Sequence, residues 1–220
     1  MYWSTLSIER SGGAETDTFL VTNPNLKYGV SDDVDIEANI APDVIVRTRD
    51  LNTGKSHTVS GIGDLFLRVK WVAIGNSGSD FALAIDADLK LPTANKNIGN
   101  GAVEGGVVVP MSYALDDVWS IGMTPELDVL KNASDGGRHI ALTNVIGIGR
   151  SISGGVTLGA EIWGSTDLDP SGSTQQYSFD LDAAWQPQSD PDLQLDGGMN
   201  FGLNADTPRS QIYFGVSRRF

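Results

Sequence analysis

Residues 192–220 read DLQLDGGMNFGLNADTPRSQIYFGVSRRF and decide the fold class of the chain. In the first half of this stretch, apolar side chains fall on every second position: Leu193, Leu195, Met199, Phe201 and Leu203. Polar residues and glycine lie between them, so the stretch predicts a strand with one apolar and one polar face. The turn-rich ADTPR segment leads into a second alternating run that closes with Phe220. A last strand that finishes in an aromatic residue is typical of bacterial outer-membrane barrels, and it also occurs in soluble β domains.

The composition limits the class of the protein and its partners. With 220 residues and 26 glycines, the chain suits one large all-β domain or two small ones. The absence of cysteine excludes disulfides, thiolate metal sites and cysteine nucleophiles. A formal net charge of -13 disfavours nucleic acid as a partner, since phosphate binding needs clustered lysine and arginine. No apolar run approaches the roughly 20 residues of a membrane helix, whereas a β-barrel hides its apolar band in alternation.

Alternating segments bounded by turn residues recur along residues 1–220, and they predict a single domain of about twelve strands. Tight turns are expected near 31–33, 76–79, 116–117, 153–155 and 188–191. Longer polar loops are expected near 11–17, 49–60, 93–103, 131–137, 165–175 and 204–209. Short turns at one rim and long loops at the other are the pattern of outer-membrane barrels. The sequence therefore predicts an antiparallel up-and-down transmembrane β-barrel, in which only the strand at 138–150 has no assignable apolar face.

The polar face of these strands carries the charged residues that we expect to line the lumen and set its selectivity. They are Asp64, Arg68, Lys70, Asp86, Asp88, Lys90, Glu126, Asp128, Glu161, Asp180, Asp182 and Asp196. The same face carries several glycines, which suit a crowded and strongly curved inner wall. These charges could equally form the solvated outside of a soluble barrel or sandwich. The sorting of the loops favours the membrane barrel.

The basic residues of this face are concentrated on two neighbouring strands, at 61–74 and 80–92. We expect them to face Asp64, Asp86 and Asp88 across the two strands, where opposite charges pair favourably. This ladder either fixes the wall or contributes to selectivity. The other acids have few basic partners, so an acidic wall facing a basic ladder would favour cations or neutral polar solutes over anions.

Two prolines lie at nearly matched distances from the turn at 116–117, Pro110 before it and Pro125 after it. Proline removes a ladder hydrogen bond and collects at strand edges and bulges. The pair therefore marks either tolerated bulges or a loosened wall through which a hydrophobic solute could leave sideways.

Several stretches resemble one family of outer-membrane proteins: GIGDLFLRVKW, LKLPTA with the Asn/Gly loop after it, VVVP, TPELDVL, LQLDGGMNFGLNADTP, YFGVSRRF and the early strand pair LKYGVSDDVDIEANIAP. From about Trp3 to Phe220, the chain is similar to the transporter-like family labelled "putative MetA-pathway of phenol degradation". The resemblance implies an outer-membrane β-barrel that moves small molecules, aromatic ones among them, and no established catalytic residue. One departure is Arg218, where an aromatic residue often precedes the last two residues; its guanidinium is expected to reach lipid headgroups.

About twelve strands give a lumen wider than that of an eight-stranded barrel and narrower than that of porins with sixteen or more strands. We therefore expect a narrow, porin-like channel for passive passage, with outer-membrane lipid and a small-molecule solute as its partners. The first ten residues lack the features of a signal peptide, so a Gram-negative outer-membrane location requires that one was removed. Two alternatives stay open: a structural or partner-binding outer-membrane barrel without transport, and a soluble β-barrel or sandwich domain.

No enzymatic, metal or cofactor site is expected. Neither His57 nor His139 is spaced with another ligand for zinc. A membrane-embedded hydrolase would need His139 beside Ser134 or Ser151, and no motif supports that pairing. The DLDPSG segment at 167–172 begins like a calcium loop, but serine holds the position of the expected bidentate acid.

Overall fold

The computed structural model describes residues 1–11, 13–75, 79–134 and 136–220. These residues form sixteen strands of one antiparallel sheet. The strands are β1 Tyr2–Ser11, β2 Ala14–Thr22, β3 Asn25–Gly29, β4 Val34–Ile40, β5 Asp43–Asp50, β6 Ser56–Gly61, β7 Leu65–Ile74, β8 Phe81–Leu91, β9 Glu104–Val108, β10 Met111–Ala114, β11 Trp119–Lys131, β12 Arg138–Ile152, β13 Val156–Asp167, β14 Thr174–Trp185, β15 Leu193–Gly202 and β16 Ser210–Arg218. Among the described residues, no helix is long and apolar enough to span a membrane.

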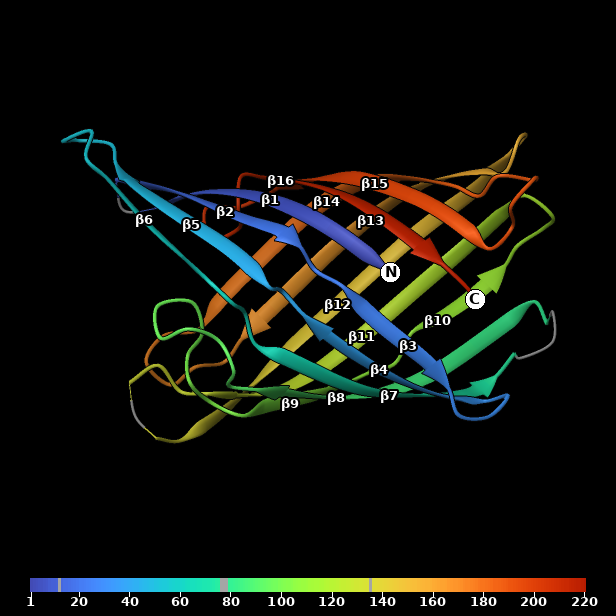
Figure 1. Cartoon of the computed structure of the whole chain (residues 1–220), viewed down its shortest axis with the longest axis horizontal. Coiled ribbons are helices and arrows are strands. Elements are labelled where there is room, and N and C mark those ends of the chain that lie inside the picture. Colours follow the sequence, from blue (N-terminus) through green and yellow to red (C-terminus); the bar gives the residue numbers. More distant parts are fainter. Residues whose placement is uncertain (12, 76–78, 135) are drawn as a thin grey trace.

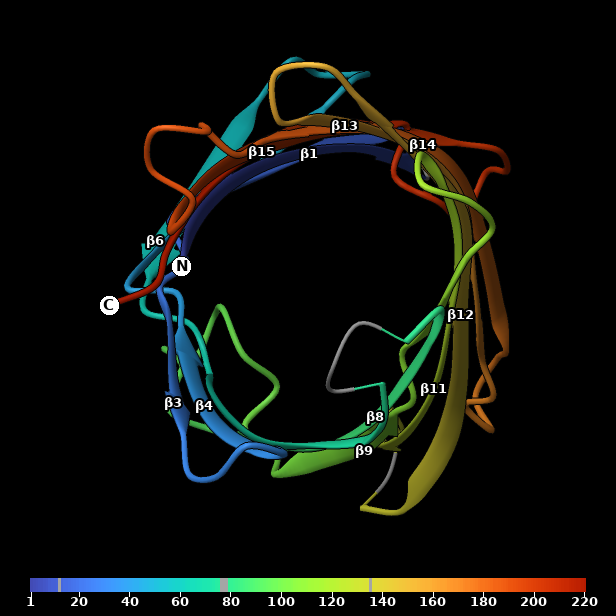
Figure 2. The same cartoon turned by 90° about the vertical axis from the view of Figure 1, so that its right-hand side faces the viewer.

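The first and last strands pair with each other and close the sheet. Strand β1 lies antiparallel to β16, with Tyr2 opposite Val216 and Ile8 opposite Ser210. Figure 2 shows the result as a ring of strands seen end on. In Figure 1 both termini lie toward one end of this ring. Most strands therefore have a hydrogen-bonded neighbour on each side, as an all-β membrane domain requires. Within the described part of the sheet, β3 pairs only with β4, and β6 pairs only with β5.

The strand count differs from the predicted twelve because four spans are interrupted. Two or three residues separate the two strands in each of four consecutive pairs: β2/β3, β4/β5, β6/β7 and β9/β10. The two strands of such a pair follow one line in the sheet, since β2 pairs with β5 while β3 pairs with β4. Register is kept across the breaks: Val44 lies opposite Gly61, and Ile40 lies opposite Leu65. Three breaks contain a proline, which cannot donate to the ladder. When the two strands of each interrupted pair are counted as one span, the sixteen strands form twelve spans.

The wall near Pro110 and Pro125 keeps its pairing. The amide of Val109 donates to the carbonyl oxygen of Pro125 at 2.9 Å, and the amide of Ala84 donates to that of Pro110 at 2.9 Å. Strand β11 also keeps one register against β9 and β10. Pro110 therefore interrupts a strand and Pro125 lies within the continuous strand β11, both without opening the wall, and the loosened-wall interpretation of this pair is wrong.

The two faces of the sheet are inverted relative to a soluble barrel. The side chains of Leu181, Leu195 and Phe201 are 46%, 37% and 39% exposed, whereas Asp86 and Asp180 are 6% and 8% exposed. The buried apolar residues are few and mostly small: Ala41, Val44, Ala84, Ala102 and Ala141. No large side chain is fully buried among the described residues. The apolar surface thus lies on the outside of the ring and the charged groups lie within it, which excludes a central hydrophobic core.

Strand β12 shows why its faces could not be assigned from the sequence. Ile140, Ile146 and Ile148 are exposed, so the even-numbered residues face outward. Asn144 interrupts this apolar row, while Val145 stands on the opposite face. Because a polar residue lies on the outer face and an apolar residue lies on the inner face at mid-strand, neither set of alternate residues is uniformly apolar in the sequence.

The connections are less sharply sorted by length than predicted. At 11–17 the expected loop shrinks to a short turn, because β1 runs to Ser11 and β2 begins at Ala14. Strands likewise extend into the expected loops at 49–60 and 165–175. The connection between β8 and β9 remains long, at the end opposite the termini (Figure 1). The expected turn at 76–79 lies largely on residues 76–78, outside the described residues.

A charge placed on the outer face should destabilise the protein in a bilayer. Leu181→Arg puts a cation where the apolar surface is exposed, and we expect a loss of about 2–4 kcal/mol in the free energy of unfolding if the site lies near the midplane. Leu181→Met, which stays apolar, is the matched control. Reversible urea unfolding in phospholipid vesicles measures both. Equal stability of the two variants would contradict an outward apolar band.

Candidate functional site

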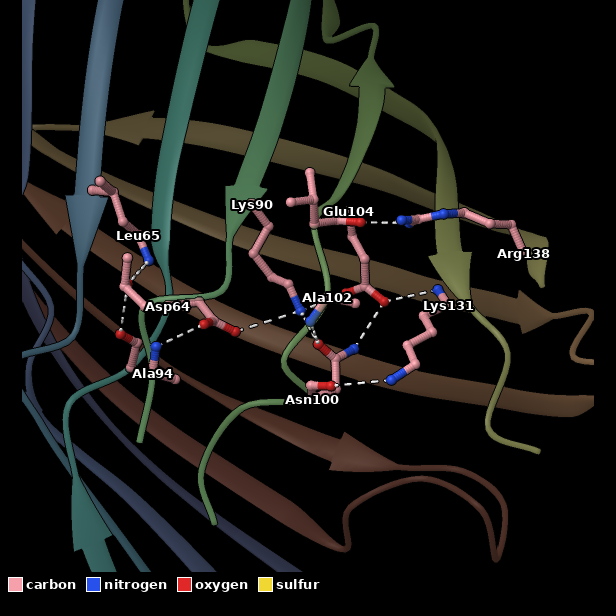
Figure 3. Close-up of polar contacts among 12 residues, drawn as sticks. Asp64, Leu65, Lys90, Ala94, Asn100, Ala102, Glu104, Lys131 and Arg138 are labelled. Carbon is pink, nitrogen blue, oxygen red and sulfur yellow. Dashed lines mark hydrogen bonds and ion pairs between the residues drawn. The ribbon is translucent and has the colours of Figure 1, made fainter. Parts of the chain in front are cut away.

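Lys90 is the centre of a buried ionic cluster on the inner face (Figure 3). Its ammonium Nζ lies 2.5 Å from Oε2 of Glu104 and 3.4 Å from Oδ2 of Asp64, and it donates to Oδ1 of Asn100 at 2.7 Å. The three charged side chains are about one-tenth exposed. Strand β8 supplies the lysine, β9 supplies Glu104, and Asp64 immediately precedes β7. One cation therefore joins three neighbouring strands through two carboxylates in a poorly solvated place.

The same carboxylates hold the connection between β8 and β9. Asp64 accepts the amide of Ala94 at 2.9 Å, and Glu104 accepts the amides of Asn100 Nδ2 and Lys131 N, both at 2.8 Å. Thr93 and Asn95 add bonds from this connection to Leu65 N and Ile62 N. Figure 2 shows this green segment inside the outline of the ring. The ionic cluster therefore fixes a segment that narrows the ring from within.

The predicted basic ladder is present in the sheet register. Arg68 lies opposite Asp88, and Lys70 lies opposite Asp86. Lys90 lies opposite Phe66, although its ammonium reaches Asp64 as described above. On their other side, Arg68 and Lys70 face Glu37 and Asp35 of β4, and Lys27 of β3 lies 2.6 Å from Asp35. The basic residues of this wall are thus surrounded by acids on both neighbouring strands.

The other predicted acids lie further round the ring, on β11 and β13 to β15. They are Glu126, Asp128, Glu161, Asp180, Asp182 and Asp196. Glu161 and Asp180 are direct cross-strand neighbours. Among the described residues, none of the six forms an ion pair with a basic side chain. These acids therefore lie together without an ion-pair partner, and of the six only Glu126 is close enough to Arg68 to feel its charge.

Glycines on adjacent strands make room for these carboxylates. A Cβ atom at Gly159 would overlap the carboxylate of Asp182, and one at Gly215 would overlap that of Asp196. Gly106 gives the same space to Asp128. Each acid therefore lies flat across a neighbouring strand, which explains why glycine accompanies acidic residues on the polar face.

His139 is tied to residues at the loop end of the ring. Its Nε2 atom lies 2.9 Å from Oδ1 of Asp167, and its Nδ1 atom lies 3.0 Å from Oδ1 of Asn132. The Nδ1 atom thus pairs with Asn132, and Nε2 lies within ion-pair distance of Asp167 without a hydrogen bond among the described residues; neither partner is a serine of the hydrolase hypothesis. Among the described residues, no group of three or more His, Cys, Asp or Glu side chains is placed to hold a metal ion.

Several contributors were not predicted. Glu104 and Asn100 belong to the ionic cluster, but both fall in or beside an expected loop and carried no alternation signal. Asp35, Glu37 and Phe66 alternate with apolar residues in the sequence, which places them on the polar face, but they were not among the residues expected to line the lumen. Phe66 adds an aromatic side chain to this face, opposite Lys90.

Removing the buried ammonium should release the β8–β9 connection. Lys90→Met leaves two buried carboxylates without their cation, and we expect a loss of about 3–5 kcal/mol in stability, with faster hydrogen exchange at the amide of Ala94. Lys131→Met is the control, because its exposed ammonium makes one long contact of 3.5 Å to Asn100 O. Urea unfolding and hydrogen exchange in lipid measure both variants. Similar losses in the two would show that the cluster does not anchor the segment.

Asp169, in the connection between β13 and β14, should keep its charge to unusually low pH. Its Oδ1 accepts the hydroxyl of Ser171 at 2.6 Å and the amide of Ser171 at 2.7 Å, while Oδ2 accepts the amide of Ala133 at 2.7 Å. These bonds lower the pKa of Asp169 from 3.8 to about 2. Because the folded-state pKa is depressed, the stabilisation is present above pH 3.8 and is lost as the pH falls toward 2.

The carboxyl carbon shift of Asp169 in micelles, followed by NMR through this pH range, measures that pKa. We expect Ser171→Ala to raise it, because the hydroxyl bond is lost. Ser173→Ala should leave it in place. A normal pKa in the unmodified protein would show that this connection is not held as described.

Comparison with known proteins identifies the family of the chain and solved structures with a similar fold. The model of the family described as "Putative MetA-pathway of phenol degradation" matches residues 3–220. No curated protein matches the chain in sequence.

Solved structures of outer-membrane channels and porins are similar to the whole ring. An outer membrane channel from Pseudomonas putida superposes with a TM-score of 0.71 at 15% identity, covering 100% of this chain and 93% of that one. The NanC porin superposes with a TM-score of 0.63 at 9% identity and 100% coverage of both chains. The KdgM porin gives a TM-score of 0.57 at 9% identity, covering 99% of each chain. At these identities the likeness is one of fold.

Proposed function

The chain belongs to the "Putative MetA-pathway of phenol degradation" family, and from this premise we propose that it is a channel of the bacterial outer membrane for passive passage of small molecules. Residues 1–220 form one membrane domain of twelve spans in this proposal. The observation that carries it is the inversion of the two faces within a closed ring. A soluble barrel would bury Leu181 and expose Asp180, whereas the reverse is found.

The polar face lines the lumen of the proposed channel. Of the twelve charged residues predicted for this face, nine are acidic and three are basic. The basic ones lie between acids of the neighbouring strands. The acids on β11 and β13 to β15 lack such neighbours, apart from Glu126, which lies near Arg68. A pore wall of one charge sign attracts ions of the other sign and repels its own. Small cations and neutral polar solutes should therefore pass more readily than anions.

Aromatic solutes remain part of the proposal. The description of the family refers to phenol degradation, and Phe66 places an aromatic ring among the charged side chains. Twelve spans give a narrower lumen than the sixteen or more of open porins, which limits solutes to small molecules. The segment held by Lys90 narrows the path further.

Ion selectivity in planar bilayers tests the proposal. We expect a reversal potential that favours potassium over chloride, and a several-fold smaller preference in the Asp180→Asn/Asp182→Asn double variant, since two uncompensated charges are removed. Asp117→Asn, in the exposed turn between β10 and β11, is the control and should change selectivity little. Preference for chloride in the unmodified protein would overturn the charge argument. Absence of any conductance would favour a structural or partner-binding barrel.

A further inference from the structure

A polar pocket of about 280 Å³ lies on the inner face near the loop end of the ring. Strands β13 to β16 supply its wall and the connection between β15 and β16 covers it. The side chains that matter for its chemistry are Trp163, Gln176, Ser178, Asn200, Thr207 and Gln211. The pocket thus combines one indole, three carboxamides and two hydroxyls, with no basic residue.

The sheet register brings these groups together. Trp163 of β13 lies opposite Ser178 of β14, and Asn200 of β15 lies opposite Gln211 of β16. Asn200 also faces Asp180, so the pocket adjoins the uncompensated acidic wall. The polar side chains of these four adjacent strands therefore lie side by side at one height of the ring.

Some of the polar atoms hold the pocket in shape, whereas one lacks a hydrogen-bond partner within the described residues. The hydroxyl of Thr207 accepts the amide of Tyr177 at 2.8 Å, and the amide of Gln176 donates to the carbonyl of Asp206. By contrast, the buried Oδ1 atom of Asn200 has no hydrogen-bond partner within the described part of the chain. A buried acceptor without a partner costs about 1–3 kcal/mol. Because this atom is closed to solvent in the structure, a ligand hydroxyl would donate to it only after the Asn200 side chain turns toward the pocket.

The chemistry of the lining selects the ligand. Carboxamides both donate and accept hydrogen bonds, and hydroxyl groups on a ligand do the same, so several hydroxyls can pair with several amides at once. The indole offers a flat apolar surface to the C–H face of a saturated ring. An anion would find no cation in the lining and would meet Asp180 nearby. A phenol carries a single hydroxyl and would leave most of the amides unpaired.

We propose that this pocket is a docking site for a neutral monosaccharide or cyclic polyol at the loop-side entrance. The inference rests on the proposed channel and adds one class, neutral rings with several hydroxyl groups, to the small molecules that this channel passes. Its volume of about 280 Å³, just below the usual range for small-molecule pockets, admits one such ring and excludes an oligosaccharide. A bound ring would lie against Trp163, beside the acidic wall, and would satisfy Asn200 once that side chain turns toward it.

Calorimetric titration of the folded protein in detergent with D-glucose and myo-inositol tests the proposal. We expect saturable binding of at least one of them, and no comparable binding of gluconate or phenol. Trp163→Ala should weaken binding about tenfold, and Asn200→Ala about fivefold. Gln194→Ala is the matched control, because this amide stands on the same face of β15 but outside the pocket lining; its binding should be unchanged.

Each other outcome has a defined meaning. Binding of neither neutral probe, tighter binding of gluconate or phenol, or equal weakening by Gln194→Ala and the pocket variants overturns the docking site. Asn200→Leu keeps the approximate shape of the side chain and loses both its donor and its acceptor, so it replaces Asn200→Ala if that variant does not fold. Bilayer conductance is recorded in parallel. Conductance without sugar binding defeats this inference alone, whereas sugar binding without conductance defeats the proposed channel and leaves the site.

Discussion

The pairing of β1 with β16 is the constraint on which the rest of the molecule depends. Hydrocarbon offers no partner to a backbone amide or carbonyl, so a sheet can cross a bilayer only when its two edges meet. Closure also separates the faces. Once the ring is shut, alternate residues of every strand must point to lipid or to the interior. The apolar rows through Leu181 and Phe201 and the acidic rows through Asp180 and Asp182 are two consequences of that single geometry.

The interior can hold many charged side chains because glycines on neighbouring strands leave space for them. Carboxylates on one strand lie over glycines on the next, as Asp182 does over Gly159 and Asp196 over Gly215. A side chain at those glycines would push the acids toward the axis and fill the ring. The arrangement keeps negative charge against the wall, where it shapes the field without occupying the path. Glycine in these strands thus weakens local strand propensity and in return leaves room inside the ring.

Alternation and turn residues were enough to predict an all-β barrel and the face on which Asp86 and Asp180 lie, because a period of two is a local property of the sequence. The interruptions were not predictable in detail, since proline at positions such as Pro110 is compatible with either a bulge or a break. The ionic cluster at Lys90 was missed in part because Glu104 reaches it only when the β8–β9 connection folds back into the ring. The pocket at Trp163 depends on four strands and one connection meeting at a single level, which no local pattern encodes.

The distribution of partners around the ring changes the expected field. The sequence suggested a basic ladder facing an acidic wall, and thus a field across the lumen. In the structure Lys90 is shared between Asp64 and Glu104, while Arg68 stands between acids on both neighbouring strands. The electrostatic potentials of opposite charges that lie this close together largely cancel away from the wall. The ladder therefore adds little net positive potential to the lumen. The acids on β11 and β13 to β15 have no such partners, and under the proposed function the lumen is electronegative throughout. A neutral ring seated beside Asp180 is compatible with that potential, whereas an anionic solute is not.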